Sequence, residues 1–302
     1  MVTGCNSNGQ TKKEKIDKLV NLATVTDSLM DLTTSLKYYS DILDLDSTNL
    51  IALNNRGRAY VWLGQLDKGF ADFDNAVRLY PHERTFYTRG MAYLNINRYD
   101  KAMQDLMKSI DLNPEFGEAY YGLSLVKANE DSLDLALQLC DKADQLSDMQ
   151  SLSRQIRFTI YQKKADFKAV INELTELIKL DPTNPTYYNN RGLAKNQLKE
   201  YADAISDFDY AIKLDAKMAF AFNNKAFALL KLEQFDHALE TVNASLDLNN
   251  KNAYAFKNRA EIFIALNAKQ KACIDLAQAE KLSDEKELTT EIKQLMDKIC
   301  KE

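Results

Sequence analysis

The 302-residue chain contains few of the residues that interrupt helices or build tight turns. It has only 9 glycines and 4 prolines. Strands joined by tight turns need more of both residues, because glycine and proline supply the backbone angles of those turns. We therefore predict a mostly helical protein.

Several functional classes lack the residues that they normally use. The 44 acidic residues outnumber the 39 basic ones, and the resulting net charge of −5 argues against a nucleic-acid partner. Two histidines and four cysteines leave little material for a metal site or a histidine-based catalytic centre. No apolar run approaches the roughly 18 residues of a membrane-spanning helix. We expect no metal and no cofactor.

A short motif recurs along the chain at intervals of about 34 residues. Asn-Asn-Arg-Gly at 54–57 returns as Tyr-Thr-Arg-Gly at 87–90 and as Asn-Asn-Arg-Gly at 189–192. Weaker copies are Asn-Asn-Lys-Ala at 223–226 and Lys-Asn-Arg-Ala at 257–260. The pattern resembles the tetratricopeptide repeat, a helix–turn–helix unit of about 34 residues.

This resemblance implies an all-α fold, a right-handed superhelical solenoid of eight repeats closed by a C-terminal capping helix. One hairpin cannot bury its apolar stripe alone, so neighbouring hairpins must stack. The predicted repeats span 16–49, 50–82, 83–116, 117–150, 151–184, 185–218, 219–252 and 253–286. Residues 287–302 form the capping helix, and residues 1–15 hold a lipobox-like cysteine and a polar tether.

Five repeats place an arginine sixteen positions before an acid. In a hairpin with a short turn these two positions face each other, so we predict arginine–carboxylate bridges between the two helices of a repeat. Such a bridge contributes under about 1 kcal/mol if it is exposed. Two repeats have apolar or aromatic residues at both positions, Leu22/Tyr38 and Leu123/Leu139, and the seventh repeat breaks the pattern with Lys225 and Thr241. The five pairs are Arg56/Asp72, Arg89/Asp105, Arg157/Glu173, Arg191/Asp207 and Arg259/Asp275.

The resemblance also implies a concave groove, lined by the first helix of each repeat, that binds a peptide segment or a partner helix. Asparagine amides can clamp a peptide backbone because they both donate and accept hydrogen bonds. Aromatic side chains give a large contact area at a low entropy cost. The same asparagines could instead serve helix ends, and the aromatic side chains could belong to the core. The predicted binding residues are Asn54, Asn55, Arg58, Trp62, Arg84, Tyr87, Tyr121, Asn189, Asn190, Asn223, Asn224, Lys257 and Asn258.

The sequence gives no support to an enzymatic function. His82 and His237 fall in different repeats, and neither has a serine or cysteine at catalytic spacing. The chain also has no glycine-rich phosphate loop. We predict a non-enzymatic scaffold for protein–protein interaction. Two alternatives stay open, namely a cytosolic peptide-binding regulatory adaptor and a structural, self-assembling solenoid.

The N-terminus resembles the lipobox of bacterial envelope lipoproteins. Val-Thr-Gly precedes Cys5, and a polar stretch follows it. Only Met1 precedes this tetrad, whereas a lipoprotein signal has a basic and an apolar region upstream. The resemblance implies a lipid anchor on Cys5 and a location in the bacterial cell envelope, in the periplasm or at the outer membrane, with the cytoplasm as the alternative.

Cys273 and Cys300 are candidates for a disulfide. Two antiparallel helices at the end of the chain would bring them close, and an envelope location would permit the bond. Helical register leaves the two residues about one turn out of line. The sequence therefore leaves the disulfide open.

Overall fold

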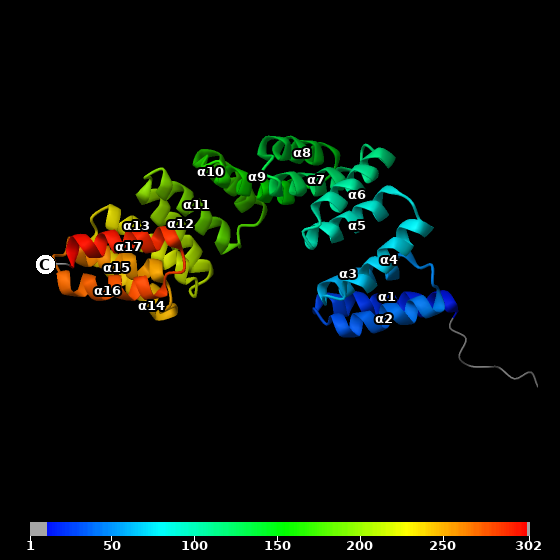
Figure 1. The fold of residues 1–302 in the computed structure, drawn as a ribbon, viewed down its shortest axis with the longest axis horizontal. Helices are drawn as coiled ribbons and strands as arrows, with labels where there is room; N and C mark the ends of the chain where they lie inside the picture. Colours follow the sequence, from blue (N-terminus) through cyan, green and yellow to red (C-terminus); the bar gives the residue numbers. More distant parts are fainter. Residues whose placement is uncertain (1–10, 301–302) are drawn as a thin grey trace, which may run out of the picture. The chain divides into compact units, whose positions relative to one another are not determined.

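The computed structural model describes residues 11–300, and this range is helical almost throughout (Figure 1). It contains seventeen helices and no strand, which confirms the predicted all-α fold. Cys5 lies outside the described residues. The chain divides into two compact units, residues 1–156 and 157–302, and each unit is described by itself.

Consecutive helices pair into hairpins within each unit. The first unit contains α1 (Lys12–Ser28), α2 (Leu32–Leu45), α3 (Leu50–Trp62), α4 (Leu66–Leu79), α5 (Glu83–Asn95), α6 (Tyr99–Leu112), α7 (Gly117–Asn129) and α8 (Leu133–Leu146). The second unit contains α10 (Phe167–Leu180), α11 (Pro185–Gln197), α12 (Tyr201–Leu214), α13 (Ala219–Lys231), α14 (Phe235–Leu248), α15 (Ala253–Ala265), α16 (Lys269–Leu282) and α17 (Lys286–Ile299). Helix α9 (Gln150–Lys163) crosses the boundary between the units.

A residue with positive φ stands in the turn of every hairpin. Only one of these residues is glycine, Gly64, whereas the other seven carry side chains and have φ between 53° and 63°. After α5, the amides of Asn97 and Arg98 bond back to the carbonyls of Leu94 and Tyr93. This pattern satisfies carbonyls that the end of a helix leaves unpaired. The turn residues are Met30, Gly64, Asn97, Asp131, Ala165, Lys199, Glu233 and Asn267.

Glycines let the two helices of a hairpin approach closely. A Cβ on Gly192 would lie 2.6 Å from a ring carbon of Phe208, and a Cβ on Gly57 would lie 2.9 Å from the Phe73 ring. Both phenylalanine rings are fully buried. The recurring Arg-Gly motif therefore combines a polar contact with the smallest residue beside it.

Four of the five predicted arginine–carboxylate pairs are confirmed. In each, the guanidinium donates from Nε and Nη2 to both oxygens of the carboxylate, at 2.6 to 2.9 Å. The carboxylates are buried, so the small contribution of an exposed pair does not apply to them. The pairs are Arg56/Asp72, Arg89/Asp105, Arg191/Asp207 and Arg259/Asp275. The fifth pair, Arg157/Glu173, stays a prediction.

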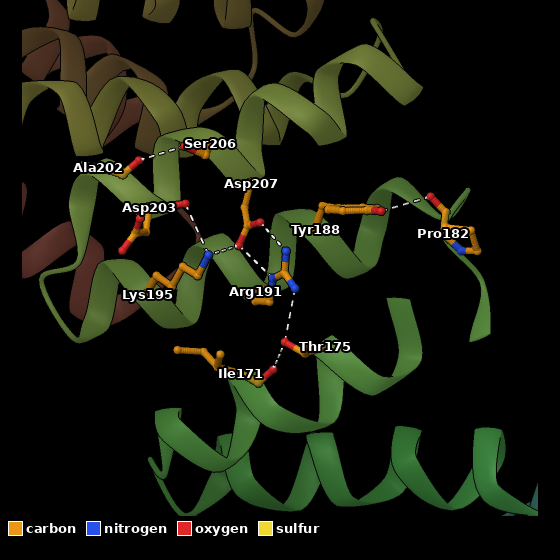
Figure 2. A network of polar contacts seen from close by, with 10 residues as sticks. All are labelled: Ile171, Thr175, Pro182, Tyr188, Arg191, Lys195, Ala202, Asp203, Ser206 and Asp207. Atoms are coloured by element: carbon orange, nitrogen blue, oxygen red, sulfur yellow. Dashed lines mark hydrogen bonds and ion pairs between the residues drawn. The ribbon is translucent and has the colours of Figure 1, made fainter. Parts of the chain in front are cut away.

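Each of these arginines also reaches the second helix of the preceding hairpin, a contact that the sixteen-residue spacing does not predict. Figure 2 shows Arg191 on α11 held by Asp207 on α12, while its Nη1 donates to the Thr175 hydroxyl on α10 at 3.2 Å. Lys195 adds a second cation, with Nζ 2.7 Å from Asp207 Oδ2. The Nη1 partners in the other three repeats are Ser40, Asp74 and Asn243. One guanidinium thus joins three helices, and we call this arrangement the brace.

The brace gives a first prediction. Asp207→Asn removes the charge that compensates Arg191 and Lys195, two cations whose side chains are only 17% exposed. Breaking a buried pair from one side costs about 3 kcal/mol of unfolding free energy. Urea unfolding followed by circular dichroism measures this loss.

Glu280→Gln serves as the matched control in the same unit. Glu280 lies 3.6 Å from Lys293, and that lysine is 60% exposed. The control should change the unfolding free energy by less than about 0.5 kcal/mol. Equal losses in the two variants would show that the brace is no stronger than a surface ion pair.

Candidate functional site

The first helices of successive hairpins form one face in each unit, which we call the first-helix face. Helix α3 contacts α5 and α5 contacts α7 in the first unit, and α11, α13 and α15 contact one another in order in the second. All thirteen predicted binding residues lie on these helices. Asn54, Asn55, Arg58 and Trp62 are on α3, Arg84 and Tyr87 on α5, Tyr121 on α7, Asn189 and Asn190 on α11, Asn223 and Asn224 on α13, and Lys257 and Asn258 on α15.

Three of the predicted residues meet around a hollow in the first unit. Asn55, Arg58 and Trp62 line it together with Asp27 and Met30 from the end of α1 and the turn after it. Trp62 is 60% exposed and is the only tryptophan of the chain. An indole that remains this exposed contributes little to the core and offers a large apolar surface to a partner.

The polar side of this hollow is held by a buried tyrosine. The Tyr39 hydroxyl donates a 2.6 Å hydrogen bond to Asp27 Oδ2. Burial and this bond raise the pKa of Tyr39, while Asn55 and Arg58 act in the opposite direction. The phenol is therefore a neutral donor that fixes the Asp27 carboxylate. Asp27 and Tyr39 had no motif in the sequence that marked them.

Arg58 remains available at the same hollow. Its side chain is exposed and forms no ion pair with any residue in the described range. Arg58 can therefore pair with an acidic group brought by a partner. The hollow thus offers an exposed indole, an amide and an exposed guanidinium within about two turns of α3.

The two predicted tyrosines of the first unit are less exposed than Trp62. Tyr87 packs edge-on against Phe116, with ring centroids 5.5 Å apart, and burial raises its pKa to about 12. Burial also raises the pKa of Tyr121. Arg84 covers the Phe116 ring at 5.1 Å and lies 3.7 Å from Glu118. Tyr87 and Tyr121 therefore belong largely to the packing between hairpins, which was the alternative role for the aromatic side chains, whereas the Arg84 side chain is 62% exposed.

The asparagines of the second unit bind one another. The Asn224 amide donates to Asn189 Oδ1 at 3.0 Å, and the Asn258 amide donates to Asn223 Oδ1 at 2.9 Å. Asn189 also donates to Asn190 Oδ1 at 3.2 Å. Since Asn189, Asn223 and Asn258 are at most 8% exposed, these amides tie neighbouring first helices together and do not stand free. The spacing of 35 residues within both pairs is the sequence signal that could have predicted these bonds.

The far end of the same face is closed by charged residues of α17. Lys257 Nζ lies 2.8 Å from Glu291 and 3.2 Å from Glu261, so this predicted cation is engaged within the chain. The Tyr254 hydroxyl donates to Glu285 at 2.6 Å, and this bond raises its pKa to about 12. The second unit therefore presents fewer free polar groups than the hollow at Trp62.

Cys273 and Cys300 form a disulfide, with Sγ atoms 1.99 Å apart and Cα atoms 5.8 Å apart. The bond links α16 to the end of α17. Leu288 and Ile292 on α17 are buried against the last hairpin as well. The terminal helix is thus held by apolar packing and by one covalent bond.

Residues 11–300 contain neither a membrane-spanning helix nor a cluster of metal-binding side chains. No helix in this range is long and apolar enough to cross a membrane. Within the same residues, no cluster of three or more histidine, cysteine or carboxylate side chains is arranged to hold a metal ion.

Two segments of the chain match known family models. Residues 84–116 and residues 158–219 match models described as tetratricopeptide repeat. The chain contains tetratricopeptide repeats. A curated relative, the BBSome complex member BBS4 of Bos taurus, is 24% identical over 201 residues. The match covers 62% of this chain but only 36% of the bovine protein.

Solved tetratricopeptide-repeat structures share the fold. The APC/C hetero-tetramer Cut9-Hcn1 aligns with a TM-score of 0.58 and 22% identity, over 95% of this chain and 57% of that one. YrrB, described as a TPR protein with an unusual peptide-binding site, aligns with a TM-score of 0.50 and 20% identity, over 63% of this chain and 97% of that one. At this identity the likeness extends to the fold.

The disulfide gives a second prediction. Cys300→Ser should lower the free energy of unfolding by about 2–4 kcal/mol, because the 27-residue separation between the cysteines is no longer closed by a bond. Hydrogen exchange followed by mass spectrometry should show faster exchange in α17, while the first unit stays unchanged. If α17 exchanges equally slowly in the wild type and in Cys300→Ser, Leu288 and Ile292 hold the helix without the disulfide.

Proposed function

We propose that the chain is a non-enzymatic scaffold that binds an extended peptide or a partner helix in a concave groove along its first-helix face. The observation that carries this proposal is the exposed Trp62 beside the unpaired Arg58 at the α3 hollow. Binding energy in protein interfaces is concentrated in a few tryptophan, tyrosine and arginine residues. The first unit places two such groups within reach of one ligand.

Each lining group has a role in this proposal. Trp62 and Met30 receive an apolar side chain of the partner, Arg58 pairs with an acidic group, and the Asn55 amide bonds to the partner backbone. The paired asparagines of the second unit keep its first helices in register. BBS4 and Cut9-Hcn1 are, by their names, members of multi-protein assemblies, and YrrB is described as having a peptide-binding site. These similarities support a binding role without giving the partner.

The third prediction concerns peptide recognition. Peptides selected on the full chain from a random displayed library should lose affinity about 30-fold or more in a Trp62→Ala variant, as expected for a central anchor residue. Fluorescence polarisation of the labelled peptides measures both affinities. Arg58→Glu should weaken most the peptides that carry acidic residues.

A matched control is available on the other side of the same unit. Met107 on α6 is 52% exposed, so Met107→Ala removes a similarly exposed apolar side chain from a second helix. This variant should bind the peptides like the wild type. Equal losses of peptide affinity in both variants, or an unchanged affinity in Trp62→Ala, would refute binding at the first-helix face. If no peptide binds and the protein only associates with itself, the self-assembling alternative is supported.

We further propose that the protein is a bacterial envelope lipoprotein, anchored through lipid on Cys5. Two observations support this. The tetrad at residues 2–5 resembles a lipobox, and the Cys273–Cys300 disulfide suits an oxidising compartment. Stable anchoring requires more than one acyl chain, which lipoprotein cysteines carry. The cytosolic regulatory adaptor is the competing proposal.

The fourth prediction tests the anchor. Metabolic labelling with an alkyne fatty acid in the native host should label the wild-type protein and place it in the detergent phase after extraction. Cys5→Ser should abolish both results, whereas Cys300→Ser should leave them intact. Unlabelled wild-type protein in the aqueous phase would favour the cytosolic adaptor.

A further inference from the structure

The brace has a second component that recurs in several hairpins, an aromatic ring beneath the guanidinium. The ring belongs to the residue three positions before the arginine, on the same first helix. A guanidinium over an aromatic face is attracted by the electron density of the ring. The pairs are Arg89 over Phe86 at 5.8 Å, Arg191 over Tyr188 at 5.7 Å and Arg259 over Phe256 at 5.4 Å.

The hairpin of α13 and α14 keeps the ring but lacks the guanidinium. Phe222 occupies the aromatic position, and Lys225 stands where the arginine would be. The Lys225 Nζ lies 2.7 Å from Asp209 on the preceding α12. Thr241 replaces the aspartate, and its hydroxyl donates to the carbonyl of His237 on its own helix. The two helices of this hairpin are therefore not joined by a brace.

A hollow of about 410 Å³ remains at this place. The apolar part of the hollow is formed by Ile205, Phe222, Leu229 and Ala244, and the polar part by Lys225, His237, Glu240 and Thr241. Its volume falls within the range of roughly 300–1,000 Å³ that is usual for ligand sites. It lies between α12, α13 and α14, and none of the thirteen predicted binding residues lines it.

One carboxylate of the hollow, that of Glu240, can receive a cation. Asp209 neutralises Lys225, whereas Glu240 is exposed and forms no ion pair with a residue of the described range. The Glu240 carboxylate is thus left to face an incoming group. An arginine satisfies three features at once: its planar guanidinium stacks on a ring, donates to a carboxylate and donates to a hydroxyl oxygen.

We propose that this hollow binds an arginine side chain presented by a partner protein. The guanidinium covers Phe222 and donates to Glu240 and to the Thr241 hydroxyl. It thus supplies from outside the contact that the four braced hairpins make within the chain. The partner contact therefore lies apart from the first-helix face and is independent of the groove proposal.

The experiment restores the internal brace. The double variant Lys225→Arg/Thr241→Asp reproduces the set that Arg89 forms with Asp105 and Asp74, because Asp209 is already present. We expect a higher melting temperature and a filled hollow. N-acetyl-arginine amide is titrated into the full-length wild type and the double variant, and the methyl signals of Leu229, Ile205 and Thr241 are followed by NMR.

Saturable shifts in the wild type that vanish in the double variant support the proposal. N-acetyl-lysine amide should bind roughly tenfold more weakly, because an ammonium cannot stack on the ring and bridge two acceptors. Phe222→Leu keeps the hollow apolar and should also weaken arginine binding. No saturable shift, equal binding of lysine and arginine, or unchanged binding in Phe222→Leu would overturn the proposal.

A further variant separates this proposal from the groove. Trp62→Ala should leave the arginine titration unchanged, because Trp62 belongs to the other unit. Loss of arginine binding in Trp62→Ala would show that the probe binds at the first-helix face, and this would overturn the hollow as its site.

Discussion

The bidentate contact between an arginine and a buried aspartate is the constraint on which the rest of the structure depends. A carboxylate removed from water loses its hydration, and only a close, well-aligned cation compensates it. The guanidinium meets both oxygens of Asp72 or Asp275 and still has a nitrogen for the preceding hairpin. This geometry fixes the two helices of a hairpin to each other and to the second helix of the preceding hairpin. The same contact therefore supports the stacking of each braced hairpin on the one before it.

This constraint also determines which polar groups are left for a partner. The brace arginines form ion pairs and hydrogen bonds inside the chain. The asparagines of α11, α13 and α15 form hydrogen bonds between neighbouring first helices. Lys257 is held by two glutamates. Against this background Arg58 and Trp62 differ from their neighbours, since neither has a structural task that would explain its type. Groups that are already held in place within a unit bind with little reorganisation, which favours affinity.

The braces could be predicted from the sequence because both partners recur at a fixed spacing, as Arg191 and Asp207 do. The exposure of a groove residue could not, because it depends on residues from another helix. Tyr87 and Trp62 look alike as aromatic groove positions, yet Phe116 covers Tyr87 and nothing described covers Trp62 to the same extent. The Asn189–Asn224 bond depends on the offset between neighbouring first helices. Its sequence signal is the 35-residue spacing that recurs in Asn223–Asn258, and the 34-residue repeat period does not give it.

The unbraced hairpin of α13 and α14 shows what replaces the brace. Leu229, Leu230, Val242 and Leu246 are buried there in one cluster with Ile262 of the next hairpin. Replacing a buried ion pair by well-packed apolar residues is often neutral for stability. Thr241 leaves no buried carboxylate without a partner, so the hairpin loses the brace without an uncompensated charge. Stability there rests on apolar packing. An arginine bound above Phe222, as proposed, would therefore add a second specificity without weakening the stack.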